Sequence, residues 1–176
     1  MRNKRILIIV AGIMLFGLLF WTFSDLFRSE PSSGRIKTKN PTDDFTEVPF
    51  TKEGQLWFLT AEGDTIKHFD IEVADNPYES MRGLMDRNSM EDNQAMLFIF
   101  KDMRPRSFWM KNTRIPLDII YIDDQYEVVS IQKNAVPKSE ESLPSEGPAK
   151  YVVEVNAGLT DLLKIDKDSK VVFEVE

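Results

Sequence analysis

Two carboxylates, Asp118 and Glu154, are candidates for chemistry, because each interrupts an otherwise apolar segment. A charge in such a segment is costly to bury unless an opposite charge pairs with it. The expected cationic partners are Arg82, Arg87 and Lys111. As a general acid and a general base, two carboxylates can cleave a glycosidic bond if the fold sets them at the required separation. One hypothesis is therefore a hydrolase that uses Asp118 and Glu154.

A second set of residues suits ligand binding. Trp109 offers a flat apolar platform, and alternate residues of a strand share a face, so Lys111 is expected beside it. The candidate ligand-binding residues are Arg82, Trp109, Lys111, Asn112, Asp118, Glu154 and Asn156. In the alternative interpretation these polar groups satisfy one another within the sheet, and Trp109 belongs to the core. The residue pattern leaves both interpretations open, and no catalytic residue is assigned.

The sequence contains no cysteine and only one histidine, His68, which removes several kinds of chemistry. Without cysteine there are no disulfides, thiolate zinc sites, iron–sulfur clusters or thiol nucleophiles. A lone histidine in a predicted strand is typical of a surface residue. The acidic clusters lack the ligand spacing of a calcium loop, so no metal and no cofactor is expected. Carboxylates, amides and basic side chains remain, and this shortage favours binding over catalysis.

The distribution of charge divides the chain into two parts. Residues 1–40 hold seven of the 22 basic and two of the 29 acidic residues, so residues 41–176 carry a net charge of −12. Binding to nucleic acid requires clustered Lys and Arg that displace counterions from the phosphates. Nucleic acid is therefore not an expected partner. The acidic part is long enough to form one compact domain with its own core.

Residues Ile6–Phe23 form an uncharged apolar run of 18 residues, which as a helix would span roughly 27 Å. Basic residues precede the run, and Trp21 lies at its far end, where aromatic rings favour the lipid–water boundary. The apolar core of a cleavable signal peptide is shorter and ends at a site of small residues. We therefore expect a retained transmembrane anchor, with a signal peptide as the alternative.

The anchor sets the expected organisation of the chain. Residues 1–5 are expected to form a basic flank on the cytoplasmic side of the membrane. Basic residues also follow the anchor, but large domains translocate largely regardless of charge, so these residues do not reverse the expected orientation. Residues 24–54 contain Pro, Ser, Gly and scattered charges, and predict a flexible linker. The globular domain over residues 55–176 is then held on the extracytoplasmic side, in the periplasm or at the cell surface.

Short β-type runs dominate the domain. Residues 55–74 predict a hairpin around the turn signal at 62–64. The other predicted strands are Met96–Lys101, Arg106–Asn112, Leu117–Ile122, Tyr126–Lys133, Tyr151–Asn156 and Lys170–Val175. Without a strand–helix–strand rhythm, the pattern predicts a mainly β fold: a compact antiparallel sheet or a small, partly closed barrel with one or two short helices. Ala135–Pro148 is the longest predicted loop and a candidate functional rim.

Two short helical segments complete the predicted domain. Asn76 can cap a helix that starts at Pro77 and ends at Gly83. A last helical turn is expected over Leu159–Ile165. The methionines of the domain, Met81 among them, are expected to fill gaps in the core.

Four motifs resemble one protein family. They are Arg82-Gly83-Leu84-Met85-x-Arg87, Met96-Leu97-Phe98-Ile99-Phe100, the run FWMKNT-x-IPLDI within Ser107–Ile119, and Val153-Glu154-Val155-Asn156-Ala157-Gly158. From about Ile71 to Val175 the sequence resembles the bacterial and archaeal domain of unknown function 192. The resemblance implies an exported or envelope-tethered single domain with a compact β-rich fold, and it brings no established activity. Relatives usually have Gly-Asp where this chain has Asp168-Ser169.

These features predict a membrane-anchored extracytoplasmic domain that binds a peptide, a glycan or a protein of the envelope. Its contact with the membrane is expected through Ile6–Phe23. The alternatives are an envelope hydrolase that uses Asp118 and Glu154, and a purely structural component of an envelope assembly.

Overall fold

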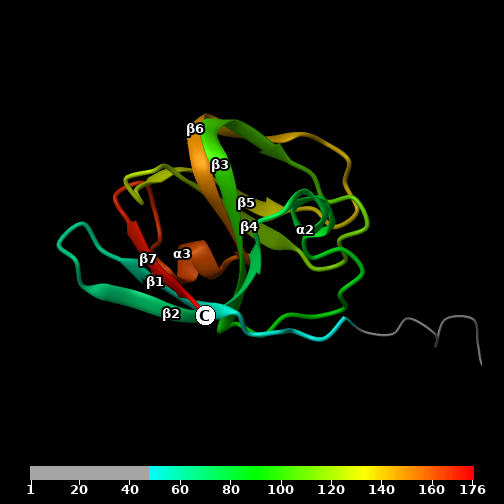
Figure 1. Cartoon of the computed structure of the whole chain (residues 1–176), viewed down its shortest axis with the longest axis horizontal. Coiled ribbons are helices and arrows are strands. Elements are labelled where there is room, and N and C mark those ends of the chain that lie inside the picture. The colour runs from blue at the N-terminus through cyan, green and yellow to red at the C-terminus, as the bar shows by residue number, and fades with distance from the viewer. Residues whose placement is uncertain (1–47) are drawn as a thin grey trace, which may run out of the picture. The chain divides into compact units, whose positions relative to one another are not determined.

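The computed structural model describes residues 48–176, so the predicted anchor Ile6–Phe23 and most of the predicted linker lie outside the described residues (Figure 1). Seven strands and two short helices form the described part. In chain order they are β1 (Gly54–Leu59), β2 (Thr65–Ala74), α2 (Pro77–Arg82), β3 (Gln94–Phe108), β4 (Leu117–Ile122), β5 (Val128–Ala135), β6 (Leu143–Asn156), α3 (Leu159–Leu163) and β7 (Lys170–Val175). Within residues 48–176, no helix has both the length and the apolar character needed to cross a membrane.

The seven strands form one sheet in the order β5-β4-β6-β3-β2-β1-β7. The sheet curls until its two edge strands meet at one end. There the Val128 N–H donates to the Ser169 carbonyl at 3.2 Å, and the Val171 N–H donates to the Tyr126 carbonyl at 2.9 Å. The predicted mainly β class is confirmed, in the form of a curled half-barrel with two short helices.

One pair of neighbouring strands is parallel, which the sequence pattern does not predict. In β2 and β3, Asp70 lies opposite Gln94 and Ala74 lies opposite Phe98. The connection between the two strands holds α2 and makes one strand–helix–strand unit (Figure 1). The helix has only six residues, too few to show the 3.6-residue periodicity that identifies such a crossover. The expectation that the domain lacks such a unit is therefore wrong.

The ends of α2 follow their predicted chemistry. The Asn76 side chain accepts a hydrogen bond from the Glu79 N–H at 3.0 Å, and Pro77 occupies the first turn. At the other end Gly83 has φ +48° and ψ −133°, a backbone conformation that favours glycine. The predicted helix is confirmed at both ends.

Apolar side chains pack on both faces of the sheet. The inner core includes Phe58, Phe69, Leu97, Val153 and Val171, together with Leu159 of α3, which lies within the curl (Figure 1). The outer core includes Leu84, Phe98, Met110, Leu117 and Tyr121. Because both faces are covered, all six residues of β4 are buried. A charged residue in this strand must therefore be satisfied inside the protein.

The strand β3 is longer than predicted at one end and shorter at the other. It joins the predicted strand Met96–Lys101 to the first part of the predicted strand Arg106–Asn112, and it ends at Phe108. Beyond that residue the Thr113 N–H donates to the Met110 carbonyl at 3.0 Å, which closes a turn. Residues 109–112 thus leave the sheet, and the predicted alternation of faces does not apply to them.

The strand β6 begins at Leu143, inside the predicted loop Ala135–Pro148. The part that stays outside the strands covers residues 136–142. Proline has no backbone N–H that could donate to a neighbouring strand, so the sequence around Pro144 and Pro148 favours a loop. Both prolines lie where the pairing of β3 with β6 is irregular. The irregular pairing allows the strand to contain residues that have no backbone N–H to donate. The predicted rim is correspondingly smaller.

Candidate functional site

Trp109 follows the last residue of β3, and its exposed fraction is 45%. The Lys111 Nζ atom lies 4.9 Å from the centre of the Trp109 ring. A cation at this distance from an aromatic face is attracted to it. The interpretation that places Trp109 in the core is therefore wrong. The two residues lie together as predicted, although a turn rather than a strand positions them.

Trp109 borders a groove between α2 and β3, which we call the Trp109 groove. The groove has a volume of about 410 Å³ and is lined by Ser80, Met81, Phe100, Arg104, Pro105, Arg106, Ser107, Phe108 and Trp109. Met81 is 65% exposed, so the prediction that it fills a gap in the core is wrong. Large apolar side chains that stay exposed beside a groove are typical of binding surfaces.

Two arginines make the Trp109 groove cationic. The Arg106 guanidinium lies 4.0 Å from the centre of the Phe100 ring, and its Nε donates to the Ala149 carbonyl at 3.1 Å. Arg106 also donates to Asp102, and this hydrogen bond lowers the pKa of that carboxyl. The Arg104 Nε atom lies 3.4 Å from the same carboxylate, and its side chain is exposed. The described lining of the groove includes no acidic residue.

A second cavity, which we call the Arg82 cavity, also borders α2. Its volume is about 270 Å³, and it is lined by Val48, Pro49, Thr51, Glu53, Glu72, Val73, Tyr78, Glu79, Arg82, Gly83, Arg87 and Met96. The helix supplies Ser80 and Met81 to the groove, and Tyr78, Glu79 and Arg82 to the cavity. This short helix therefore contributes side chains to both candidate sites.

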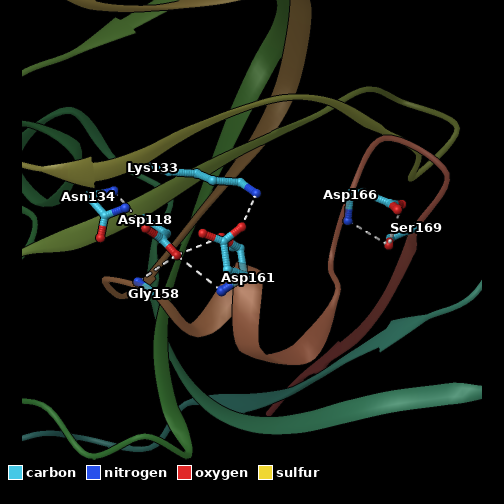
Figure 2. A network of polar contacts seen from close by, with 8 residues as sticks. Asp118, Lys133, Asn134, Gly158, Asp161, Asp166 and Ser169 are labelled. Atoms are coloured by element: carbon cyan, nitrogen blue, oxygen red, sulfur yellow. Dashed lines mark hydrogen bonds and ion pairs between the residues drawn. The ribbon is translucent and has the colours of Figure 1, made fainter.

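Asp118 is held in a closed hydrogen-bond network on the inner face of the sheet (Figure 2). Its carboxylate accepts hydrogen bonds from the N–H groups of Asn134 at 2.8 Å, Gly158 at 3.0 Å and Thr160 at 3.1 Å. The Thr160 hydroxyl donates to it at 2.6 Å. Asp118 is fully buried. Backbone donors and one hydroxyl stabilise this carboxylate in place of the predicted cation, so its role is structural.

Glu154 lies on the other face. In the pairing of β4 with β6, Asp118 is opposite Val155 of the inner core, whereas Glu154 is opposite Ile119 of the outer core. Paired residues of neighbouring strands point to the same face. The two carboxyl groups therefore share no cleft, and the sheet does not place them as the acid and base of a hydrolase.

The Glu154 side chain is buried without a hydrogen bond or ion pair to any other residue in 48–176. Burial raises its pKa to about 8, so the carboxyl group is largely neutral at pH 7. Its Oε2 atom lies 3.9 Å from the position that a Cβ atom at Gly83 would occupy. Because Gly83 lines the Arg82 cavity, a neutral carboxyl group lies next to the wall of that cavity.

Of the remaining predicted site residues, Lys111 stays beside Trp109, whereas Asn112 and Asn156 have other contacts. The Lys111 Nζ atom lies 3.7 Å from the Glu140 carboxylate. Asn112 has φ +56° in the turn after β3, a conformation that asparagine tolerates better than most residues. The Asn156 side chain donates to the Met90 carbonyl at 2.7 Å. Asn112 and Asn156 thus stabilise local structure, and neither of them lines the Trp109 groove.

Several residues of the groove were not among the sequence candidates. They are Met81, Phe100, Arg104 and Arg106. The signal that could identify them is the Arg-Pro-Arg sequence at 104–106 between two phenylalanines, since alternating basic and aromatic residues favour cation–π contacts. Arg87, an expected partner of Asp118 or Glu154, instead forms a buried ion pair with Glu72.

His68 is an exposed strand residue, as predicted. Its ring stacks on Trp57 with the ring centres 5.0 Å apart, and its Nε2 atom lies 3.2 Å from the Gln55 side-chain oxygen. The part of the chain that the structure describes holds no group of three or more acidic or histidine side chains placed to bind a metal ion.

Comparison with known proteins places the chain among proteins of undetermined activity. Residues 58–173 match the family model DUF192, described as "Uncharacterized ACR". No curated protein matches the sequence. A "putative transcription regulator" from Sinorhizobium meliloti is similar in structure, with 36% identity, a TM-score of 0.67, and coverage of 72% of this chain and 97% of that one. A protein of unknown function from Novosphingobium aromaticivorans is 38% identical, with a TM-score of 0.62, covering 67% and 83%.

Proposed function

This chain belongs to the DUF192 family, and from that premise we propose that it is a membrane-anchored extracytoplasmic module whose Trp109 groove binds a polypeptide segment of the cell envelope. The observation that carries the proposal is the exposure of Trp109 beside a groove with cationic walls. A large aromatic side chain contributes most to binding when a partner covers it.

The lining of the Trp109 groove favours a ligand that combines an apolar side chain with a carboxylate. Met81, Phe108 and Trp109 supply apolar contacts. Arg104 of the lining is an exposed cation, and Lys111, which lies against the Trp109 ring outside the lining, is a second one. Each lies near a carboxylate that a ligand can replace. A polypeptide segment with an acidic and an apolar residue matches both features. A glycan can also stack on tryptophan, so it is the competing ligand that an experiment must separate.

The same proposal places the domain outside the cytoplasmic membrane. Ile6–Phe23 has the length and composition of a transmembrane helix. The part of the predicted linker that precedes the described residues, 24–47, would as a flexible segment reach on the order of 25–30 Å from the membrane surface, enough for contact with neighbouring envelope proteins. Residues 48–54 instead belong to the domain, where the Thr51 N–H donates to Glu72 and β1 begins at Gly54. The domain's net negative charge disfavours nucleic acid as its partner, so the regulator description of one structural relative is not carried over to this chain.

Capture from an envelope extract tests this function. The full chain in detergent micelles should retain a protein or peptide, and Trp109→Ala or Lys111→Ala should weaken the retention while the melting temperature barely changes. Trp57→Ala and Lys138→Ala are matched controls outside the groove and should retain the partner as the unchanged chain does. Loss of retention after glycosidase treatment, but not after protease treatment, would indicate a glycan ligand and contradict the proposal.

A structural role without a ligand is the second candidate function. It is favoured by side chains such as Val172, which is 49% exposed on the outer side of β7 and could contact an assembly partner. Such a role would leave Trp109→Ala without effect on assembly. The opposed faces of Asp118 and Glu154 give no comparable support to a hydrolase.

A further inference from the structure

Each acidic residue that lines the Arg82 cavity has at least one hydrogen-bond partner, although the Glu72 Oε2 atom, which faces Arg87, has no hydrogen bond of its own. One Glu72 carboxylate oxygen accepts from the Thr51 N–H at 2.6 Å, and the group forms a buried ion pair with Arg87. Glu53 accepts from the Val73 N–H at 2.8 Å. The Glu79 carboxylate accepts from the Asp75 N–H at 3.3 Å. These carboxylates are therefore partly neutralised by donors of the protein itself.

The donors around the same cavity are less well matched. Arg82 lines it, and its side chain has no ion pair or hydrogen bond within the described residues. Arg87 also lines it and is 94% buried, yet its Nε–H lacks an acceptor there. A buried donor that lacks an acceptor costs free energy that a suitable ligand can recover.

We propose that the Arg82 cavity binds a small molecule through a carboxylate group, with Arg82 as the residue that pairs with this carboxylate. A volume of about 270 Å³ accommodates a small dicarboxylate or a short acyl chain with a carboxylate head. Tyr78 and Met96 provide apolar contacts for the remainder of such a molecule. This site is separate from the Trp109 groove, and its existence does not rest on the proposed function.

Methionine methyl groups report on the two sites separately, because Met96 lines the Arg82 cavity and Met81 lines the Trp109 groove. The experiment uses the full chain in detergent micelles with ¹³C-labelled methionine methyl groups, and assigns the two signals with Met96→Leu and Met81→Leu. Sodium succinate is the probe, with sodium chloride at equal ionic strength as the reference. We expect a saturable shift of the Met96 signal and a constant Met81 signal.

Substitution separates a specific pairing from general electrostatics. Arg82→Gln should weaken the apparent affinity for succinate about tenfold, the usual loss for one charge-assisted hydrogen bond. Lys138→Gln removes an exposed cation elsewhere and should leave the affinity unchanged. Arg82 is exposed, so this substitution does not threaten folding. Equal affinity in Arg82→Gln and the unchanged chain would overturn the proposal.

A cationic probe tests the opposite chemistry at the same place. Glu53 and Glu79 also line the cavity, so putrescine is titrated in parallel. A Met96 shift with putrescine and none with succinate would show that the cavity binds amines, and the proposal would fall. Absence of a saturable shift with either probe would overturn it as well. Neither result would affect the Trp109 groove, whose partner is detected by a different measurement.

Discussion

Asp118 and Glu154 lie on adjacent strands but project from opposite faces of the same sheet. Asp118 accepts four hydrogen bonds on the inner face. Glu154 accepts none from the described residues on the outer face. The same chemical group therefore has two different effects on stability. Asp118 organises the residues around it, whereas Glu154 is accommodated by protonation.

Replacement of Asp118 should strongly destabilise the domain. Asp118→Ala leaves three backbone N–H groups and the Thr160 hydroxyl without their acceptor, which should lower the free energy of unfolding by about 3–5 kcal/mol. Thr160→Val removes only one of these donors and should cost about 1–2 kcal/mol. Urea denaturation followed by circular dichroism measures both values. Equal losses in the two variants would contradict the network in Figure 2.

Glu154 should make the stability of the domain depend on pH. Its pKa rises from 4.5 to about 8 on folding, because burial disfavours the charged form. The folded state then binds the proton more tightly than the unfolded state does. The contribution of the protonated Glu154 to the stability of the domain is therefore fully present below about pH 4.5, and it is lost as the pH rises toward 8.

Glu154→Gln removes the titrating carboxyl group, so this variant serves as the reference for the dependence of stability on pH. The difference in unfolding free energy between the variant and the unchanged chain should grow in favour of the variant by on the order of 1 kcal/mol per pH unit. Urea denaturation across pH 4.5 to 8 tests this, because the other titrating groups cancel in the difference. Parallel profiles would show that Glu154 has an ordinary pKa.

Gly83 should tolerate a side chain less well than Gly63. A Cβ atom at Gly83 would lie 3.2 Å from the Phe98 ring, and the residue has φ +48°. Gly63 has φ +96° with open space around it. Gly83→Ala should therefore cost about 2–3 kcal/mol, and Gly63→Ala about 1 kcal/mol. Thermal unfolding compares the two, and a smaller loss at Gly83 would contradict the close contact with Phe98.

The parts of the fold that local chemistry determines were predictable from the sequence. The hairpin of β1 and β2, the Asn76 cap and the strands β4 and β7 each depend on neighbouring residues. The turn before β7, which contains Asp168-Ser169, is closed by two hydrogen bonds: the Ser169 N–H donates to the Asp166 carbonyl, and the Ser169 hydroxyl accepts from the Asp166 N–H (Figure 2). A side-chain hydrogen bond thus stabilises the turn that has this sequence.

The parts that depend on distant contacts were not predictable. The parallel pairing of β2 with β3 and the prolines within β6 are set by partners far along the chain. Because both faces of β4 are buried, its sequence does not alternate between apolar and polar residues. The sequence therefore does not show to which face of the sheet Asp118 points. The sequence indicates Trp109 as a candidate, but its exposure results from the end of β3 at Phe108. The prediction that Met81 belongs to the core fails because helical spacing does not show which side of a short helix faces solvent.

Protease accessibility tests the proposed orientation in the cell. The domain should resist protease added to the cytoplasmic side of inverted membrane vesicles, because the anchor Ile6–Phe23 would hold it on the opposite side. It should be cleaved in spheroplasts, or in intact cells if it lies at the cell surface. A domain that is protected until the cytoplasmic membrane is opened would contradict the outward orientation.

The central claim, that the Trp109 groove binds an envelope polypeptide, is tested most directly by site-specific photocrosslinking in cells. A photoreactive amino acid replaces Met81 in the groove or, as the control, Val172 on β7, both of which are exposed. The account predicts a discrete protease-sensitive adduct from position 81 that disappears with Trp109→Ala, and no such adduct from position 172. No adduct from position 81, or an adduct that persists in a folded Trp109→Ala variant, would contradict it.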